Sequence, residues 1–242
     1  MQLITDYATN DAYLRLLLQG PPGSGKTTLS CQMPKAYIAD CDLNLGGALR
    51  YLRDAKLPLP VGYDTIDRKE DGTDVDPAMR FERMVMCLQK AAADPSVETL
   101  VIDSATKVSD YIIAHTLRLQ NKKAMEMTSW GFYLGYWKEL VNKLSSVRKN
   151  LVLIAHEKVE KDEIDQSLKY FLLIPGQFGN MAGSLFTDVW RCEVAAGAGF
   201  GANVKYAWNV RTMPDHKFQL KNSLGLPAVF SFSWDLIAAK LK

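Results

Sequence analysis

The stretch "LLLQGPPGSGKTTLS", residues 16–30, decides the fold because an apolar run leads into a glycine-rich turn and then into Lys26-Thr27-Thr28. The spacing Gly20-x4-Gly25-Lys26-Thr27 matches the P-loop, whose backbone N–H groups surround the phosphates of a nucleotide. In this motif the lysine reaches the β- and γ-phosphates, and the hydroxyl that follows it binds Mg²⁺. We expect the nucleotide to be bound by Gly20, Pro21, Pro22, Gly23, Ser24, Gly25, Lys26, Thr27 and Thr28.

The segments on either side of this loop match its usual setting. Residues 13–19 are predicted to form a buried strand that enters the loop. Residues 27–33 are predicted to form a helix whose N-terminus faces the bound anion. The alternative, a chance glycine turn, requires neither element, so the context favours nucleotide binding.

Further along the chain, predicted strands alternate with helices. Strands are predicted at 36–40, 61–66, 99–103 and 151–156, and helices at 81–93 and 132–147. This alternation predicts an α/β fold with a mostly parallel, twisted sheet flanked by helices. After about residue 186, strands predicted at 189–194, 204–211, 218–220 and 230–234 should add antiparallel strands at the C-terminal end. The stretch "AAGAGFGA", residues 195–202, is expected to be a hairpin turn.

Length and composition predict one globular unit. The chain has 242 residues, 48% of them hydrophobic, and no visible linker, so we expect a single domain over 1–242 that includes a short N-terminal segment at 1–11. The longest apolar runs, such as 151–155, are too short to span a bilayer, and residues 1–10 do not match a secretory signal. We therefore expect a cytoplasmic protein with no membrane association.

The cysteines, the histidines and the net charge argue against a zinc-binding protein, a disulfide-rich protein and a strongly basic nucleic-acid-binding protein. The four cysteines and three histidines lack the spacing of a zinc site or a disulfide framework. The formal net charge is +2, so any surface for nucleic acid would have to be a local patch.

The stretch "ETLVIDSAT", residues 98–106, places Asp103 at the end of a predicted strand. A carboxylate there can hold Mg²⁺ opposite Thr27, directly or through water, as in P-loop enzymes generally. The alternative is that Asp103 only caps the following turn. AAA-type motors and many helicases carry a water-activating glutamate at the next position, where this chain has Ser104. The catalytic base must therefore come from elsewhere.

The stretch "AYIADCDLNLGG", residues 36–47, offers two candidates for that base. Asp40 and Asp42 lie two positions apart where a strand ends, so both can point to one face. Either can polarise the attacking water, and Asp42 is the stronger candidate. The alternative is that one or both cap a helix that begins near Asn44.

The stretch "NLVLIAHEKVEKDEIDQSLKYFLLIPG", residues 150–176, places His156 at the carboxyl end of an apolar strand, the edge at which open α/β sheets bind ligands. A long polar loop is expected to follow, and loops of that length usually have a function. His156 is a candidate sensor of the γ-phosphate. The alternative is a local hydrogen bond near the strand end.

Together, "GPPGSGKT", the acidic pair, "LVIDS" and "LIAHE" before a long loop resemble the RecA-like recombinase ATPases. The compact length and the segments "IPGQFG" and "FTDVWRCEV" are similar more narrowly to the phage RecA-like proteins that act as single-strand annealing recombinases. The resemblance covers about residues 12–235. It implies a RecA-like P-loop NTPase core that uses ATP with Mg²⁺.

The resemblance also implies site residues. Asp42 falls where the family carries its catalytic glutamate, and His156 where the bacterial recombinases carry a glutamine that couples ATP to DNA. In "HKFQLKNSLGLP", residues 216–227, Lys221 and Asn222 match a Lys-Asn-Lys stretch that reaches the neighbouring subunit's γ-phosphate, with Ser223 in place of the second lysine. The alternative for Lys221 is an ordinary exposed strand residue. The implied catalytic set is Lys26, Asp40, Asp42, His156 and Lys221.

Two segments resemble the DNA-binding loops of the family, at about 120–131 and 157–176. Their lysines and aromatic residues combine phosphate-pairing charge with stacking surface, which suits single strands. Without the resemblance, the aromatic residues fit a helix core and the lysines a solvated face. The candidate DNA contacts are Lys122, Lys123, Trp130, Lys158, Lys161, Lys169, Tyr170 and Phe171.

The function implied is ATP-dependent binding of single-stranded DNA that promotes annealing or strand pairing in phage recombination, inside a bacterial host. Homo-oligomers, as rings or filaments, and a single-strand-binding protein as partner are implied in the same way. Two alternatives stay open: a DNA motor of the helicase or packaging type, and a P-loop small-molecule kinase, although no arginine-rich lid is visible.

Overall fold

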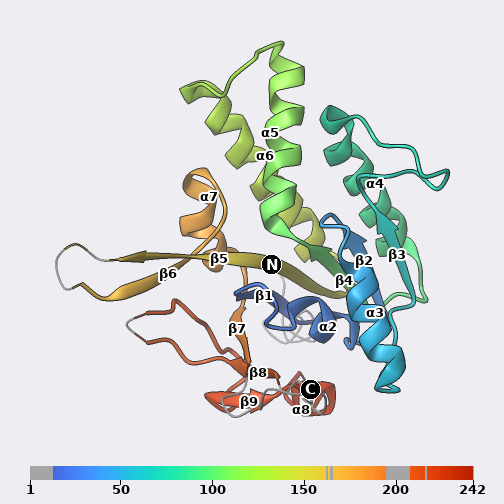
Figure 1. Cartoon of the computed structure of the whole chain (residues 1–242), viewed down its shortest axis with the longest axis vertical. Coiled ribbons are helices and arrows are strands. Elements are labelled where there is room, and N and C mark those ends of the chain that lie inside the picture. The colour runs from blue at the N-terminus through green and yellow to red at the C-terminus, as the bar shows by residue number, and fades with distance from the viewer. Residues whose placement is uncertain (1–12, 162, 164–165, 195–207, 216, 242) are drawn as a thin grey trace, which may run out of the picture.

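The computed structural model describes residues 13–161, 163, 166–194, 208–215 and 217–241. Its centre is a twisted sheet in the order β3-β2-β4-β5-β1-β7-β8-β9, with β6 paired to β5 (Figure 1). The strands are β1 Arg15–Gly20, β2 Ala36–Asp40, β3 Gly62–Thr65, β4 Thr99–Asp103, β5 Asn150–Lys161, β6 Leu168–Leu172, β7 Asp188–Val194, β8 Trp208–Arg211 and β9 Val229–Ser231.

Strand direction divides this sheet into two parts. The six neighbours from β3 to β7 pair in parallel, whereas β8 and β9 add antiparallel strands beside β7. The predicted α/β fold, mostly parallel with antiparallel strands at the C-terminal end, is confirmed. Because the strands are parallel, their carboxyl ends meet at one edge, where Gly20 pairs with His156 and Asp40 with Asp103.

Helices cover both faces of the sheet. They are α2 Lys26–Cys31, α3 Leu45–Asp54, α4 Arg80–Ala93, α5 Ala105–Gln120, α6 Met127–Ser145, α7 Gly176–Met181 and α8 Trp234–Ala238, with 3-10 turns η1 Pro77–Met79 and η2 Ala182–Leu185.

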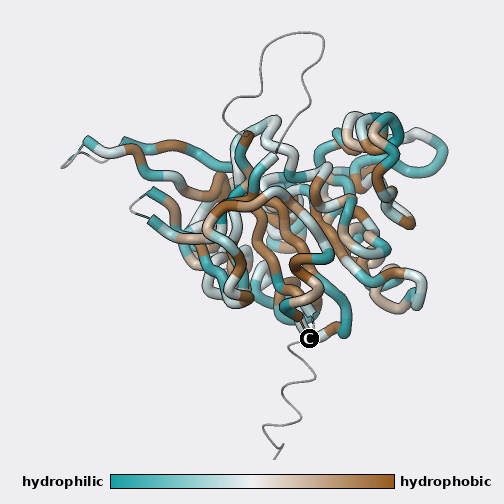
Figure 2. Tube along the Cα trace, turned by 90° about the horizontal axis from the view of Figure 1, so that it is seen from below, coloured by the Kyte–Doolittle hydropathy of each residue, from teal (hydrophilic) through white to brown (hydrophobic). Residues whose placement is uncertain are grey.

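The side chains of β1 alternate between two cores, as the period of a strand requires. Leu17 packs into the core under α4, α5, α6 and α7, whereas Leu16 and Leu18 pack into the core under α2, α3 and α8. The central strands are brown along most of their length in Figure 2, and the outlying loops are mainly teal. Strands buried on both faces explain the continuous apolar run that precedes the P-loop.

The region after β5 differs from the prediction. The expected long loop is wrong in part, because β5 continues to Lys161 and pairs with β6 as an antiparallel hairpin. Figure 1 shows this hairpin projecting from the body of the molecule. Main-chain pairing accounts for the length of the segment, which composition alone does not reveal.

Other boundaries also differ. The predicted strand at 218–220 is wrong, since only Lys221 forms an isolated bridge there, with Val189. The strand predicted at 230–234 ends at Ser231, and α8 begins at Trp234. The long helix α5, directly after β4, was not expected.

Three expectations fall on residues outside the described ranges: the N-terminal segment at 1–11, the turn at 195–202, and the first part of the strand predicted at 204–211. Within those ranges, no helix has both the length and the apolar character needed to cross a bilayer.

Candidate active site

The P-loop connects β1 to α2, and its backbone depends on glycine. Gly25 has φ +86, in the left-handed region that other residues rarely adopt. A Cβ atom on Gly25 would also lie 2.6 Å from the Trp208 ring. Both constraints explain why glycine precedes the lysine here.

The Lys26 side chain folds into the loop. Its Nζ donates hydrogen bonds to the carbonyl oxygens of Gly20 and Pro21, each at 2.8 Å. The residue is 5% exposed, and burial lowers the pKa of its ammonium group. The predicted phosphate-binding lysine therefore lies at the centre of its loop.

Thr27 and Asp103, the two residues predicted to hold Mg²⁺, are in direct contact. Thr27 Oγ1 donates to Asp103 Oδ2 at 2.5 Å, joining the start of α2 to the end of β4. Asp103 is 1% exposed, and its pKa is raised to about 6, chiefly by burial and further by the nearby Asp42 and Asp40. A nearly buried carboxylate next to a hydroxyl is a donor pair that suits Mg²⁺.

No group of three or more His, Cys, Asp or Glu residues able to hold a metal is found among the described residues. A magnesium ion at Thr27 and Asp103 would therefore need its other ligands from phosphate oxygens and water, which is how Mg²⁺ usually binds beside nucleotides. The residues present fit the predicted ion.

Asp42 and His156 form a pair across the sheet edge. Asp42 Oδ2 lies 3.1 Å from His156 Nε2, although 114 positions separate them in sequence. Burial alone would raise the pKa of Asp42, but the contact with His156 and other nearby polar groups outweighs it and the net shift is downward. An ionised Asp42 therefore orients the His156 ring.

Asp40 has different surroundings. It is 5% exposed, and burial raises its pKa against the opposing effect of the Leu45, Asn44 and Leu43 backbone N–H groups at the start of α3. The N-cap residue of α3 is Asn44 rather than Asp40, so the helix-capping alternative for Asp40 stays a prediction.

These residues surround a pocket of about 440 Å³ at the sheet edge. His156 and Asp103 line it, whereas Asp42 contacts it through His156. Of the predicted loop residues, Gly20, Pro21 and Ser24 do not line the pocket. The lining consists of Pro22, Gly23, Gly25, Lys26, Thr27, Thr28, Asn44, Gly47, Ala48, Tyr51, Asp103, His156 and Trp208.

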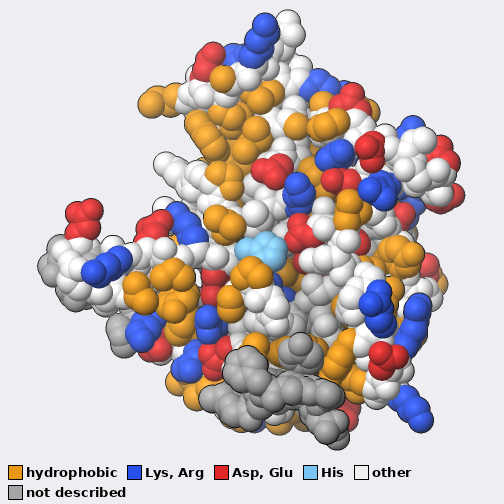
Figure 3. Space-filling view, viewed as in Figure 1, with side chains coloured by type: hydrophobic (Ala, Val, Ile, Leu, Met, Phe, Trp, Pro, Cys, Tyr) orange, Lys and Arg blue, Asp and Glu red, His pale blue; other side chains and the backbone are white. Residues whose placement is uncertain are grey.

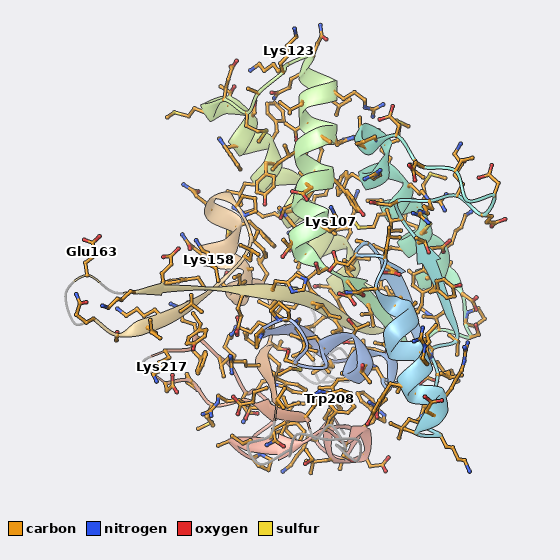
Figure 4. All side chains as sticks on the ribbon, in the orientation of Figure 1. Lys107, Lys123, Lys158, Glu163, Trp208 and Lys217 are labelled. Carbon is orange, nitrogen blue, oxygen red and sulfur yellow. The ribbon has the colours of Figure 1, made fainter. Side chains whose placement is uncertain are left out.

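Five lining residues were not predicted as site residues: Asn44, Gly47, Ala48, Tyr51 and Trp208. Tyr51 of α3 and Trp208 of β8 meet edge to face, with ring centroids 4.9 Å apart. Figure 4 labels Trp208 below the P-loop strand, between α2 and α8. The position of Tyr51 two turns into the helix after the acidic pair was a usable signal. For Trp208 the sequence carried no such signal, because Trp208 and Gly25 are separated by most of the length of the chain.

The first predicted DNA loop is the turn between α5 and α6. Lys123 is exposed at its tip (Figure 4), and Lys122 pairs with Glu126 at 2.8 Å. Trp130 is only partly exposed, because its ring packs against Gly176 and Tyr133. Lys123 is available to a ligand, Lys122 is held by Glu126, and Trp130 serves mainly in packing.

The second DNA segment, now the β5–β6 hairpin, divides its candidates between two faces. Cross-strand pairs share a face, so Lys158, Phe171 and Lys169 lie on one side. Lys161 and Tyr170 lie on the other side, and the Tyr170 ring packs on Phe218 at 4.7 Å. Figure 3 shows charged and hydrophobic side chains mixed over the projecting hairpin.

Lys221 lies apart from the P-loop pocket of its own subunit. Its Nζ donates to the carbonyl oxygens of Phe186 at 2.6 Å and Gly183 at 3.1 Å, which ties the 221 segment to η2. Acting on a neighbouring subunit would require these bonds to be released. The role in trans stays a prediction.

The class of the protein follows from the contacts at this edge. A lysine folded into a glycine-rich loop, with a hydroxyl paired to a strand-end carboxylate, is the arrangement of P-loop nucleotide-binding domains. More particularly, the chain belongs to the AAA_24 family, described as an AAA domain, whose family model matches residues 12–185. A comparison with curated proteins found no match.

Solved structures with some similarity share little sequence. The RadB recombinase is 14% identical, with 82% of this chain and 81% of that chain covered and a TM-score of 0.44. A KaiC-like protein of Pyrococcus horikoshii is 12% identical, with 91% and 90% covered and a TM-score of 0.43. An ATPase from the type III secretion system of pathogenic bacteria is 15% identical, with 76% and 55% covered and a TM-score of 0.46.

Proposed function

We propose that the protein is a RecA-like ATPase that binds single-stranded DNA and promotes annealing or strand pairing in phage homologous recombination. One observation carries the proposal: β5 passes the nucleotide pocket at His156 and continues directly into the projecting hairpin with its lysines. A single strand thus connects the site for ATP to a candidate surface for DNA. The sequence resemblance to the RecA-like recombinases supports the same reading.

ATP is the substrate whose bond breaks, between the γ-phosphorus and the β–γ bridging oxygen, and water adds to give ADP and phosphate. Lys26 neutralises phosphate charge. Asp42 and His156 align the attacking water, with His156 at the pocket wall and Asp42 behind it. DNA stays chemically unchanged.

Thr27 and Asp103 would hold Mg²⁺. When bound, the ion offsets charge on the phosphates. Tyr51 and Trp208 supply an aromatic wall to the pocket, which suits contact with the base.

The DNA surface consists of the lysines on the hairpin and on the α5–α6 turn. Lys122, Lys123, Lys158 and Lys169 provide charge for phosphates, and Phe171 provides a surface for base stacking. Homo-oligomers and cooperation with a single-strand-binding protein belong to the same proposal and rest on the resemblance. The kinase alternative is weaker, because no arginine lines the pocket where the structure describes it.

The proposal is tested with Lys26→Ala. Removal of the only ammonium group inside the described part of the loop should reduce ATP hydrolysis at least about 100-fold, because no other side chain there replaces a charge-assisted phosphate contact. Hydrolysis is measured by phosphate release with and without single-stranded DNA. Lys35→Ala, which removes an exposed lysine paired with Glu98, is the matched control and should keep wild-type activity.

DNA binding is measured on the same proteins by fluorescence anisotropy. Wild type should bind single strands more tightly than duplex in the presence of ATP, with affinity falling as salt is added. Equal affinity for both forms would favour the motor or kinase alternatives, and unchanged hydrolysis in Lys26→Ala would exclude the ATPase assignment.

A further inference from the structure

We infer that Tyr111, on the buried face of α5, is a positioning residue for ATP hydrolysis that acts through the backbone of the Asp40-Cys41-Asp42 segment. The inference rests on the proposed function of Asp42. It arises from a buried polar network beneath the site, formed by Tyr111, Asp67 and Arg80.

The Tyr111 hydroxyl lies directly under the catalytic segment. Tyr111 is 2% exposed, and its Oη is 3.1 Å from the carbonyl oxygen of Cys41, the residue between the two aspartates. The carboxylate of Asp67 is its second oxygen neighbour. Burial raises the pKa of Tyr111, so the phenol keeps its proton and remains a donor.

Asp67 is itself held in place. It is 9% exposed, and its Oδ2 accepts a hydrogen bond from Arg80 Nη1 at 2.9 Å. Arg80 is the first residue of α4, and its Nε donates to the Val75 carbonyl at 3.0 Å. The network therefore connects the start of α4 and the second turn of α5 to the segment after β2.

The same short segment is fixed from two other directions. The Cys41 N–H donates to the Asp103 carbonyl at 2.6 Å, and the Ile66 N–H donates to the Asp40 carbonyl at 3.0 Å. The Tyr111 side chain reaches the next carbonyl of the segment, that of Cys41. The peptide that carries Asp42 is thus held by β4, by the residue after β3 and by α5.

This arrangement has a consequence for catalysis. The Tyr111 hydroxyl shares one proton between the Asp67 carboxylate and the Cys41 carbonyl, so its removal takes a donor away from the Cys41 carbonyl without removing a group from the pocket lining. The carboxylate of Asp42, one residue away, must stay within hydrogen-bond distance of His156 to orient it. Small displacements of such groups reduce the rate of the chemical step more than they reduce binding.

The test is Tyr111→Phe, which keeps the ring in the core and removes only the hydroxyl. We expect kcat for ATP to fall about 5- to 20-fold while KM and the affinity for a non-hydrolysable ATP analogue change less than about 2-fold. Rates are expressed per analogue-binding site, so that unfolded protein does not imitate the effect.

Tyr133→Phe is the matched control. Tyr133 is an equally buried tyrosine whose hydroxyl bonds to Ser109 and to the Pro175 carbonyl, away from the acidic segment. Its removal should leave kcat within about 2-fold of wild type. Equal loss of kcat in both variants would show a general packing effect and would overturn the inference.

A double mutant separates positioning from stability. If Tyr111 acts through Asp42, Tyr111→Phe should add less than about 2-fold to the loss already caused by Asp42→Asn. Full additivity, or unchanged kcat in Tyr111→Phe, overturns the inference while leaving the proposed function intact. Absence of ATP hydrolysis by wild type would instead contradict the proposed function itself.

Discussion

At the scale of single residues, Asp103 shows how the site changes the chemistry of one side chain. Its carboxylate is almost fully buried beside Thr27 and is near two other acidic residues, Asp40 and Asp42. A carboxylate in such surroundings binds a cation readily, because the cation removes the cost of burying negative charge. If Mg²⁺ binds here as proposed, its site is electrostatically prepared before the ion arrives.

The raised pKa of Asp103, about 6, predicts how Mg²⁺ affinity depends on pH. Below pH 6 the carboxylate is protonated and the ion must displace a proton, so affinity for Mg²⁺ with an ATP analogue should fall as pH drops through 6 and level off above 7. Titration calorimetry between pH 5 and 8 measures this Mg²⁺ affinity. His156→Gln, which removes the nearby imidazole, should keep this profile. A flat profile in wild type would contradict the prediction.

At the scale of elements, β5 is the component that connects the two candidate surfaces. On one face of β5, the His156 ring forms a hydrogen bond with the Asp42 carboxylate. On the opposite face, the next residue, Glu157, accepts two hydrogen bonds from Arg191, at 2.9 and 3.1 Å, with only 2% of its side chain exposed. The base of the hairpin is thus held on both faces at consecutive residues, which makes the strand a stiff connection.

The two faces of the hairpin predict different effects on DNA binding. Lys158→Ala with Lys169→Ala removes two charges from the face that carries Phe171, and we expect a loss of single-strand affinity of about 10-fold and a shallower salt dependence. Lys161→Ala, on the opposite face, should have a smaller effect, of about 2-fold. Anisotropy measured at several salt concentrations distinguishes these outcomes, with Lys122→Ala and Lys123→Ala as a comparison at the α5–α6 turn. Equal losses from both faces would mean that DNA does not select one side.

At the scale of the whole molecule, Lys221 fastens the segment near the C-terminal end of the chain to β7 and to the residues of η2. Its ammonium group holds the Gly183 and Phe186 carbonyls, and its backbone pairs with Val189 of β7. This tether joins the C-terminal part of the chain to the turn after α7. A role across a subunit boundary would add to this structural one.

Lys221→Ala should lower the free energy of unfolding by about 2 kcal/mol, because two hydrogen bonds from a charged donor are lost. Lys217→Ala, an exposed lysine of the same segment (Figure 4), should change it by less than about 0.5 kcal/mol. Urea unfolding measures both variants.

If Lys221 also acts in trans, ATPase activity per subunit of wild type should rise with protein concentration or with DNA, and Lys221→Ala should abolish that rise. Activity that stays constant on dilution would remove Lys221 from the active site and would weaken the oligomeric proposal.

The sequence by itself determined the features that depend on local geometry. The strand–loop–helix that carries the P-loop was predicted from its spacing, because the glycines, the lysine and the helix start are encoded within a few consecutive positions. The strands from 36–40 and 99–103 were predicted with their observed bounds, because strands buried on both faces appear as continuous apolar runs.

Only the tertiary structure decided which distant residues meet. The partners Asp42 and His156, the position of Trp208 over Gly25, and the bonds of Lys221 all depend on the order of strands in the sheet. Local sequence patterns report burial and period but not which strands become neighbours. The hairpin was mistaken for a loop for the same reason: its polar residues are compatible with either state, and backbone pairing between β5 and β6 settles the choice.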